Sequence, residues 1–586
     1  MAGFFKGLFS GGDAPQPAAR RPAPQAAPAN KFALNGGLYM GFQIPDPESP
    51  EDYPSQSLFS LPWKHSADQW NYKSSTGNKH ILTIGPNGSG KSRGLLIPNL
   101  LRLRDWSAVV VDPKGELAVQ TAAYRQRHGS RIITLDPFGV IDTEHPGLTD
   151  RVPCLKNATF NPMSILDPAD RRFVDDATGL AETLIIDDPS GKAEKIWTGS
   201  ARDLVCGLIM GLRLDAEKLP PLGTLAAVRQ YIGMSTADLT VELKKRQLKD
   251  GSWSDPGMID RYAAEHPYIA AKLNQFVGVS GDNKTLLSVM AEAKHQLSWL
   301  DSPIINDSLN ESTVSLDTLK DVPTTVYIIL PPEELDRYAA WMRVILFALF
   351  KHLIKKKACN VPVLFMLDEF ARLGHVNIIE KNLGLLRGYG VKLWPILQNL
   401  GQLKHHYPNE WETFFGNSAV VQSYAARDKA TQDYFSAMSG TRFYWLKTAN
   451  TGGGTSLNQG QVTASNNMGE GWQQIKGPNI EPAEMGTIPA RHGVIFFEDG
   501  AICRAFFPDP SQVDGWKDVL SDAEAVARGA APARSAAAPA PARDGVMIQC
   551  PQASCKKTLR LRMDTPRKVQ VTCPHCKHQF VFNPVR

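Results

Sequence analysis

Short apolar runs recur in two separate parts of the chain. Each is bounded by polar residues or a turn, and several end in a carboxylate, as at Asp112, Asp136 and Asp368. Apolar runs of this length are typical of buried strands. They occupy residues 81–84, 107–111 and 131–135, and later 324–330, 362–367, 391–397, 419–423 and 494–497. Because helical stretches separate them, the pattern predicts an α/β fold with a mainly parallel sheet.

Between about residues 165 and 318 the apolar positions change to a helical spacing of three and four. Helices are predicted at residues 171–186, 195–215, 224–231 and 285–300, with no convincing strand among them. We therefore expect one sheet whose two sequence halves are separated by an inserted all-helical domain.

The longest apolar stretch, residues 338–354, is interrupted by Arg343, Lys351 and His352. It is too short to cross a bilayer comfortably, so a buried helix is predicted. The first ten residues also lack the long apolar core of a secretory signal. We expect a cytoplasmic chain. The aromatic patch of Phe4, Phe5, Leu8 and Phe9 is either a weak, peripheral membrane or partner contact or an idle terminus.

Composition and charge add few constraints. With 42% hydrophobic and 21% charged residues over 586 positions, the chain is globular and long enough for several domains. The formal net charge of +5 is too small for this length to indicate nucleic-acid binding by itself. Any basic surface must therefore be local.

A phosphate-binding loop follows the first apolar run. The stretch fits the spacing G-x-x-x-x-G-K-[ST] at every position, although a chance Gly/Ser turn is the alternative. Its backbone N–H groups can surround a triphosphate, Lys91 can reach the β- and γ-phosphates, and the Ser92 hydroxyl can bind Mg²⁺. The loop consists of Gly85, Pro86, Asn87, Gly88, Ser89, Gly90, Lys91 and Ser92.

Two adjacent acids end the apolar run at residues 362–367. We assign Asp368 to Mg²⁺, directly or through water, and Glu369 to the activation of the attacking water. A solvated acidic turn would explain this stretch taken alone. Together with the loop at Lys91, the pair predicts ATP hydrolysis as well as ATP binding.

Gln398 ends the next apolar run, at residues 391–397. From the end of a neighbouring strand, its amide could contact the γ-phosphate and report hydrolysis, as glutamines do in other NTPases. A plain glutamine at the end of a strand is an equally good interpretation of the spacing alone.

Four of the eight cysteines lie close to the C-terminus, as two close pairs 17 residues apart. In a reducing compartment this spacing suggests a metal site. Four thiolates form a closed, structural zinc site, and Zn²⁺ would stabilise a segment with too little core to fold alone. The predicted ligands of this zinc-ribbon-like module are Cys550, Cys555, Cys573 and Cys576.

Basic residues surround these cysteines, with a single acid, Asp564, among them. Such a face suggests contact with nucleic acid or an acidic partner, although a merely solvated face is equally compatible. The basic residues are Lys556, Lys557, Arg560, Arg562, Arg567, Lys568 and Lys577.

Four stretches together resemble the signature sequences of type IV secretion coupling proteins. Beside the phosphate-binding loop these are D-P-K-G-E at residues 112–116, D-E-F-A-R-L-G at 368–374 and Q-N-L-G-Q-L at 398–403. The resemblance covers about residues 78–508. It implies a hexameric RecA-like ATPase whose helical insertion meets substrate or relaxosome components.

The resemblance also implies site residues. Arg387 matches the family's arginine finger, which acts on the nucleotide of the neighbouring subunit, although by sequence alone it could be a solvated helix charge. Asp112, Lys114 and Glu116 match a motif near the nucleotide without a fixed individual role. Two features depart from the family: members commonly begin with transmembrane helices, which we do not find here, and the cysteine module is not a standard part.

The predicted organisation has six parts. These are a disordered tether (1–30), the first part of the nucleotide-binding domain (31–164), the all-helical insertion (165–318), the second part of the nucleotide-binding domain (319–520), an Ala/Pro-rich linker (521–545) and the cysteine module (546–586).

The predicted function is ATP-driven coupling of substrates to a type IV secretion channel. The substrates would be DNA, protein–DNA conjugates or effector proteins, and the partners would be relaxosome and secretion-channel components. The alternatives are a septal-type DNA translocase and an adaptor that binds ATP without hydrolysing it. Intact Lys91, Asp368, Glu369 and Gln398 argue against the adaptor.

Overall fold

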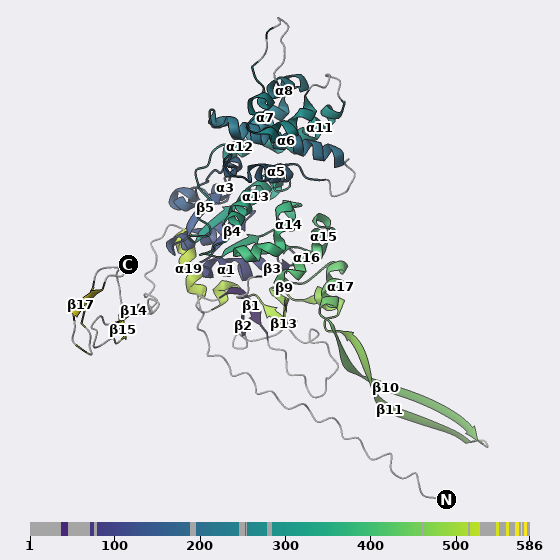
Figure 1. Cartoon of the computed structure of the whole chain (residues 1–586). Helices are drawn as coiled ribbons and strands as arrows, with labels where there is room; N and C mark the ends of the chain where they lie inside the picture. Colours follow the sequence, from purple (N-terminus) through teal and green to yellow (C-terminus); the bar gives the residue numbers. More distant parts are fainter. Residues whose placement is uncertain are drawn as a thin grey trace, which may run out of the picture. The chain divides into compact units, whose positions relative to one another are not determined.

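The computed structural model describes most of the chain, which divides into two compact units, residues 1–529 and 530–586 (Figure 1). In the first unit the described residues are 37–44, 71–75, 79–187, 195–244, 252, 255–277, 284–458, 461–513 and 516–527. In the second they are 546–549, 558–561, 569–572, 576 and 579–582. The aromatic patch and the tether predicted for residues 1–30 lie outside these ranges.

The described part of the first unit contains an eleven-stranded sheet with the order β2-β1-β13-β12-β9-β3-β8-β7-β4-β6-β5. The strands from β9 to β5 all run parallel to their neighbours, which confirms the predicted mainly parallel sheet. These strands are β3 (His80–Ile84), β4 (Ser107–Val111), β5 (Arg131–Leu135), β6 (Thr324–Ile328), β7 (Val363–Leu367), β8 (Val391–Leu397) and β9 (Ser418–Ser423).

Four antiparallel strands extend the sheet beyond β9. They are β1 (Leu38–Gln43), β2 (Asn71–Ser75), β12 (His492–Phe497) and β13 (Ile502–Phe506). Of these, only β12 is predicted by the apolar pattern. In β1, the residues from Leu38 to Phe42 are all buried, but Gly41 ends the apolar run after only three residues. Gly41 also interrupts its register with β2, at a φ of 115°.

Alternate residues of the central strands enter two different hydrophobic cores. On β7, Phe365 and Leu367 belong to one core, and Leu364 and Met366 to the other. Because side chains alternate across a strand, each core covers one face of the sheet. A strand covered on both faces is apolar throughout, which explains why the sequence alone predicts the central strands.

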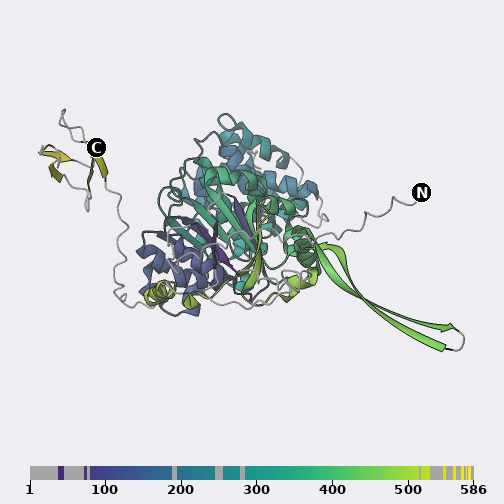
Figure 2. The ribbon, with the colours of Figure 1, turned by 90° about the horizontal axis from the view of Figure 1, so that it is seen from below.

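Helices cover both faces of the sheet (Figure 2). One core includes residues of α1 (Ile97–Arg102), α2 (Glu116–Arg127) and α19 (Trp516–Ala527). The other includes residues of α5 (Phe173–Leu184), α13 (Ala339–Lys355) and α14 (Asn377–Leu386). Helix α13 confirms the buried helix predicted at residues 338–354.

The linker prediction is wrong at its start, because residues 521–527 continue α19, where Trp516 and Leu520 are buried. Residues 528–545 are not described.

Shorter helices complete the described first unit around the ends of the strands. They are α3 (Val140–Glu144), α4 (Leu148–Arg151), α15 (Leu400–His406), α16 (Trp411–Gly416), α17 (Lys429–Met438) and α18 (Pro482–Thr487).

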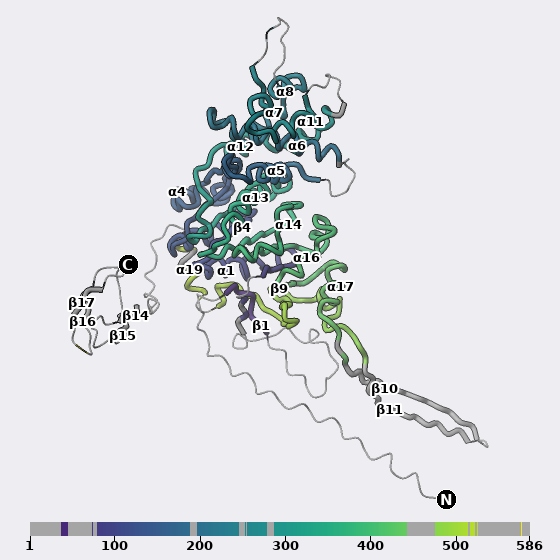
Figure 3. Tube along the Cα trace, viewed as in Figure 1, coloured from purple at the N-terminus to yellow at the C-terminus, as the bar shows by residue number. Residues whose placement is uncertain are grey.

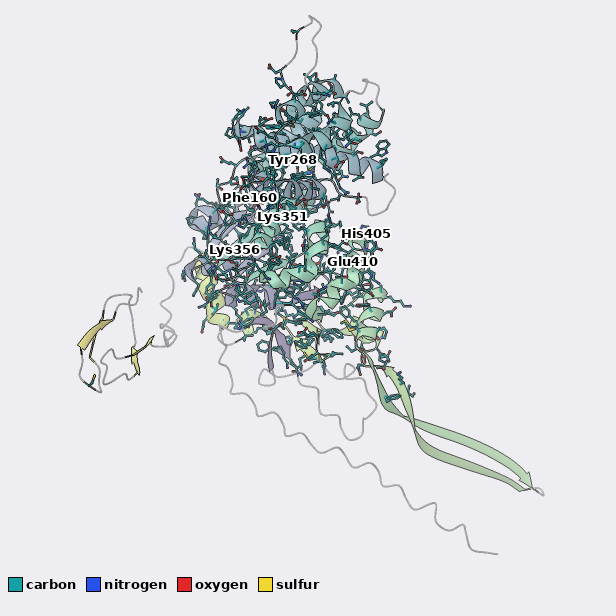
Figure 4. The ribbon with its side chains drawn as sticks, in the orientation of Figure 1. Phe160, Tyr268, Lys351, Lys356, His405 and Glu410 are labelled. Carbon is teal, nitrogen blue, oxygen red and sulfur yellow. The ribbon has the colours of Figure 1, made fainter. Side chains whose placement is uncertain are left out.

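The described residues between β5 and β6 form helices and short helical turns but no strand (Figure 3). Helix α6 (Lys195–Asp215) has the predicted bounds. Lys351 of α13 donates to Asp176 of α5 across 2.9 Å, so an ion pair supports the core between the two helices (Figure 4). The domain limits at residues 165 and 318 stay predictions. The other helices are α7 (Leu225–Gly233), α8 (Thr236–Leu243), α9 (Met258–Tyr262), α10 (Pro267–Leu273), α11 (Lys284–Gln296) and α12 (Pro303–Asn310).

Along the described residues, no helix combines the length and the apolar character that crossing a membrane requires.

A long two-stranded hairpin contains the three consecutive glycines at residues 452–454. Its strands, β10 (Thr441–Asn458) and β11 (Gln461–Pro478), pair antiparallel along their whole length. Gly and many polar residues are poor strand formers, so no apolar run marks these two strands in the sequence. Continuous backbone pairing here outweighs their low strand propensity.

The described part of the second unit contains two short antiparallel hairpins. One pairs β14 (Val546–Gln549) with β15 (Thr558–Leu561), and the other pairs β16 (Val569–Thr572) with β17 (Gln579–Phe582). Of the predicted zinc ligands, Cys576 is described and exposed. Cys550, Cys555 and Cys573 lie outside the described residues, and no metal-ligand cluster occurs within them. The zinc site therefore stays a prediction.

Candidate active site

The phosphate-binding loop joins β3 to the helical turn η2 (Ser92–Leu96) at the carboxyl edge of the parallel sheet. Gly88 and Gly90 have φ values of 76° and 88°, a region that favours glycine. Gly85 is needed for a different reason, because a Cβ there would lie 2.8 Å from the Cβ of Tyr424. The glycine pattern thus reflects both the curvature of the loop and the close approach of β9.

Lys91 lies beneath this loop with only 8% of its surface exposed. Its Nζ donates to the carbonyl oxygens of Gly85, at 2.6 Å, and Pro86, at 3.0 Å. Burial lowers the pKa of Lys91, and the nearby charges of Asp368 and Glu369 oppose this shift. The cation is thus held among hydrogen-bond acceptors, from which it could move to a phosphate.

The loop borders a cavity of about 390 Å³. Residues 87–93 supply one wall, and Asp368, Glu369 and Arg491 are among the residues opposite. The buried hydroxyl of Ser89 has no hydrogen-bond partner among the described residues. A buried donor without a partner is costly, so a ligand oxygen at this position would stabilise it. The cavity therefore has the volume and the hydrogen-bond donors that a nucleoside triphosphate requires.

Asp368 ends β7 beside Lys91. Burial raises the pKa of its carboxyl to about 6, with the negative charge of Glu369 adding to the shift and Lys91 opposing it. A divalent cation would favour the charged form. Carboxylate and hydroxyl oxygens suit Mg²⁺, so Asp368 and Ser92 fit the predicted magnesium ligands.

Glu369 adopts a left-handed backbone conformation, with φ 55° and ψ 41°. This conformation costs a residue other than glycine about 1–3 kcal/mol, and it is typical of functional positions. The Nε2 of Gln398 donates to Oε2 of Glu369 across 2.9 Å. The structure thus brings the acid and the amide together at the ends of β7 and β8.

The D-P-K-G-E stretch also borders the cavity, through Asp112, Lys114 and Glu116. Asp112 is 3% exposed and accepts a hydrogen bond from the backbone N–H of Ala118 at 2.8 Å. Burial raises the pKa of Asp112 to about 7. Because its carboxyl binds the first turn of α2, Asp112 holds this wall of the cavity in position.

Arg491 is a cavity residue that the sequence analysis does not identify. It has a φ of 60°, and its side chain packs against Gly90, where an added Cβ would lie 3.1 Å from its Cγ. Asp509 binds Arg93 at 2.7 Å and Arg491 at 3.4 Å. Arg491 and Asp509 lie about 400 residues from the loop, and no local motif marks them.

Arg387 does not join this cluster. It is exposed at the end of α14, just before β8 begins at Val391. Because β8 runs parallel to β3, Arg387 lies at the amino edge of the sheet and the phosphate-binding loop at the carboxyl edge. Seven strand residues span about 23 Å at roughly 3.3 Å each. Arg387 is therefore remote from the cavity of its own chain.

The family described as Type IV secretory system Conjugative DNA transfer matches residues 55–502. A conjugal transfer protein TraG of Escherichia coli is 26% identical over 457 residues, which cover 74% of this chain and 66% of the relative. A VirD4 protein of Rhizobium radiobacter is 27% identical over 375 residues, covering 62% and 48%. The match thus spans about half to two thirds of the length of these relatives.

Solved structures share the fold. The unbound bacterial conjugative coupling protein TrwBdeltaN70 has a TM-score of 0.53 and 15% identity, covering 74% of this chain and 85% of that one. The plasmid coupling protein TrwB in complex with ADP and Mg²⁺ has a TM-score of 0.52 at 15% identity, with the same coverage.

Proposed function

The chain belongs to the Type IV secretory system conjugative DNA transfer family, and on this premise we propose that it is a coupling ATPase. It would use ATP hydrolysis to bring DNA, protein–DNA or effector substrates to a type IV secretion channel. The main support is the convergence of Lys91, Asp368 and Glu369 on one cavity of about 390 Å³.

Each residue has a role that its position favours. Lys91 binds the β- and γ-phosphates. Ser92 and Asp368 hold Mg²⁺, which would neutralise the negative charge of the phosphates. Glu369 accepts a proton from the attacking water. Gln398 holds the Glu369 carboxylate and senses the γ-phosphate, a role that their 2.9 Å hydrogen bond supports.

Arg387 acts on the nucleotide of a neighbouring subunit in this proposal, and the assembly is a homo-hexamer. Its distance from the cavity of its own chain is compatible with action across subunits. Leu385, on the same end of α14, is 63% exposed, so an apolar side chain accompanies the exposed guanidinium. Such a pairing suits a contact between protein copies, because arginine is enriched at interfaces.

The names of the relatives motivate the substrate proposal. TraG is named as a conjugal transfer protein and TrwB as a conjugative coupling protein. We extend this to DNA and protein–DNA substrates here, with relaxosome and secretion-channel components as partners. The contact with the cell membrane would be peripheral or made through these partners.

Steady-state ATP hydrolysis by the full chain, alone and with single-stranded or double-stranded DNA, tests the proposal. A coupling ATPase should turn over ATP and change its rate with the preferred substrate. Tight ATP binding without turnover under any of these conditions would instead identify an adaptor.

For the C-terminal unit we propose a structural Zn²⁺ held by Cys550, Cys555, Cys573 and Cys576. Ligation would supply free energy that so small a core lacks. Elemental analysis of the full chain should give one zinc per chain, and replacing all four cysteines by serine should abolish it. Purified protein without zinc, prepared without chelators, would refute this site.

A further inference from the structure

A second cavity, of about 610 Å³, lies at the carboxyl edge of the sheet and shares no lining residue with the nucleotide cavity. The start of α13, the turn after β7 and helix α15 surround it. We call it the Arg343 cavity, after its most buried cation. Its polar lining residues are Asp336, Arg343, Arg372, Gln402, His405 and His406.

Arg343 is 8% exposed, and it has a single hydrogen bond in the described structure, from Nη1 to the carbonyl oxygen of Leu373 at 3.0 Å. Its buried Nε has no partner among the described residues. Burial lowers the pKa of Arg343 to about 10, so the side chain still carries its charge at neutral pH. Burying a charge without a counter-ion is unfavourable, and an anion in the cavity would compensate for it.

The rest of the lining adds hydrogen-bond donors. Arg372 is half-exposed and pairs with Asp336 at 2.9 Å. Asp336 is the only carboxylate among the lining residues, so this pair leaves the Arg343 charge uncompensated. His405 and His406 on α15 add two imidazoles (Figure 4). Guanidinium and imidazole groups around one cavity suit an oxyanion with several acceptor oxygens.

The walls of the cavity are held rigidly. Arg343 fixes the turn after β7 through Leu373, and the backbone N–H of Val376 donates to the Tyr407 hydroxyl at 3.0 Å. Phe370 stacks on Tyr407 with ring centroids 5.8 Å apart. Arg343 and the turn after β7 are therefore positioned before a ligand binds, which reduces the entropy cost of binding.

A short chain of hydrogen bonds joins the two cavities. Gln402, which lines the Arg343 cavity, accepts at Oε1 from the backbone N–H of Gln398 at 2.8 Å. The side chain of Gln398 then donates to Glu369, which lines the nucleotide cavity, at 2.9 Å. A ligand that displaces Gln402 would thus alter the support of Glu369.

We propose that the Arg343 cavity is a phosphate-binding site, and that its occupancy is transmitted through Gln402 and Gln398 to Glu369. The phosphate group comes either from free orthophosphate or from the backbone of a nucleic acid. The binding claim is independent of the proposed function. The effect on hydrolysis rests on the proposed role of Glu369.

Binding is tested on the full chain with the phosphate-binding loop saturated by a non-hydrolysable ATP analogue and Mg²⁺, so that the γ-phosphate position is filled and inorganic phosphate can bind only elsewhere. Calorimetric titration should detect phosphate binding, and Arg343→Gln and Arg372→Gln should each weaken it at least tenfold. Arg337→Gln, at an exposed arginine outside the cavity, should leave the affinity within about twofold.

Thermal unfolding identifies a variant that fails to fold; if Arg343→Gln does, the exposed Arg372→Gln decides the outcome. No phosphate binding by the unmodified chain would overturn the proposal, as would binding that neither substitution weakens. Because hydrolysis is not measured, failure of the proposed ATPase function would not affect this result.

Competition then distinguishes the two sources. A single-stranded oligonucleotide that displaces phosphate, and loses this ability in Arg343→Gln, identifies a nucleic-acid backbone; displacement only by phosphate identifies the free ion. An acidic peptide that binds where phosphate does not would refute the phosphate assignment. For the coupling, Gln402→Met should weaken phosphate binding by no more than about tenfold, because it removes at most one hydrogen bond to the ligand. Phosphate should then no longer change the rate of ATP turnover, and an unchanged response would refute the Gln402 pathway.

Discussion

At the scale of single residues, the candidate active site depends on charges that the fold holds close together and partly out of water. Burial lowers the pKa of Lys91 and raises that of Asp368, and neighbouring Glu369 adopts an unfavourable backbone conformation. Strain and perturbed pKa values at one cavity are typical of a functional site.

Replacing Glu369 by Gln should leave ATP binding within a few fold but lower kcat by about 10²–10⁴-fold, because the amide cannot accept a proton. The new side chain retains an oxygen that can accept from Gln398, so the local structure should persist. Lys91→Ala should instead abolish tight nucleotide binding. Equilibrium binding and steady-state hydrolysis separate the two effects, and undiminished turnover by Glu369→Gln would show that another group is the base.

Asp368 predicts a pH dependence. Its pKa is about 6 in the folded chain, above the ordinary value of 3.8. It is therefore protonated in most molecules below pH 6, and Mg²⁺-dependent ADP binding should strengthen as the pH rises from 5 to 7. Because Mg²⁺ competes with the proton, a higher Mg²⁺ concentration should shift the midpoint to lower pH.

The raised pKa of Asp368 also predicts how the free energy of unfolding depends on pH without Mg²⁺. The stabilisation that Asp368 contributes is fully present below pH 3.8 and is lost as the pH rises through 6. Asp368→Asn is the control, since it cannot titrate. Urea unfolding without Mg²⁺ measures the effect, and an identical pH profile of stability in this variant would assign the titration to another group.

At the scale of elements, helix α6 is the centre of the helical region and depends on close approach. A Cβ at Gly207 would lie 2.5 Å from the side chain of Leu273 on α10. Gly199, on the same helix, has no neighbouring atom within 4 Å of such a Cβ. The two glycines therefore offer a matched pair, in which one allows packing and the other only weakens the helix.

We predict that Gly207→Ala lowers the free energy of unfolding by about 1–3 kcal/mol, the usual cost of overpacking a core. Gly199→Ala should raise it by about 0.5–1 kcal/mol, because alanine is the better helix former. Urea unfolding of both variants measures the difference. Equal stabilities for the two variants would mean that α10 moves away from α6 at little cost.

At the scale of the whole molecule, the nucleotide cavity of one chain brings together most but not all of the predicted catalytic residues. Arg387 lies at the opposite edge of the sheet from the phosphate-binding loop of its own chain. In the proposed hexamer, a site would be completed by two copies. The oligomer is then required for activity, rather than only for channel formation.

Arg387→Ala should lose ATP hydrolysis, and mixing it with the Lys91→Ala variant should restore part of the activity. Mixed hexamers contain some sites with an intact loop from one chain and an intact arginine from the next. Lys381→Ala is the control, because Lys381 lies on the same helix but pairs with Glu182 at 2.9 Å; it should remain active. The absence of rescue in variants shown to co-assemble would contradict action across subunits.

The sequence by itself determined the features that depend on neighbouring residues. Buried strands such as β7 and β8 were predictable because both of their faces are covered, which makes them uniformly apolar. The phosphate-binding loop and the Asp368–Glu369 pair follow strands at a spacing that chemistry restricts. The bounds of α6 followed from its helical periodicity.

Only the tertiary structure decided which distant residues meet. Arg491 reaches the loop through the antiparallel extension of the sheet, whose strands β1 and β13 leave no periodic pattern. The remoteness of Arg387 from its own cavity follows from the parallel direction of β8. Likewise, the sequence shows Arg343 only as one charge in an apolar helix; the cavity around it arises where α13, α15 and the turn after β7 come together. Such contacts depend on topology, which no local pattern records.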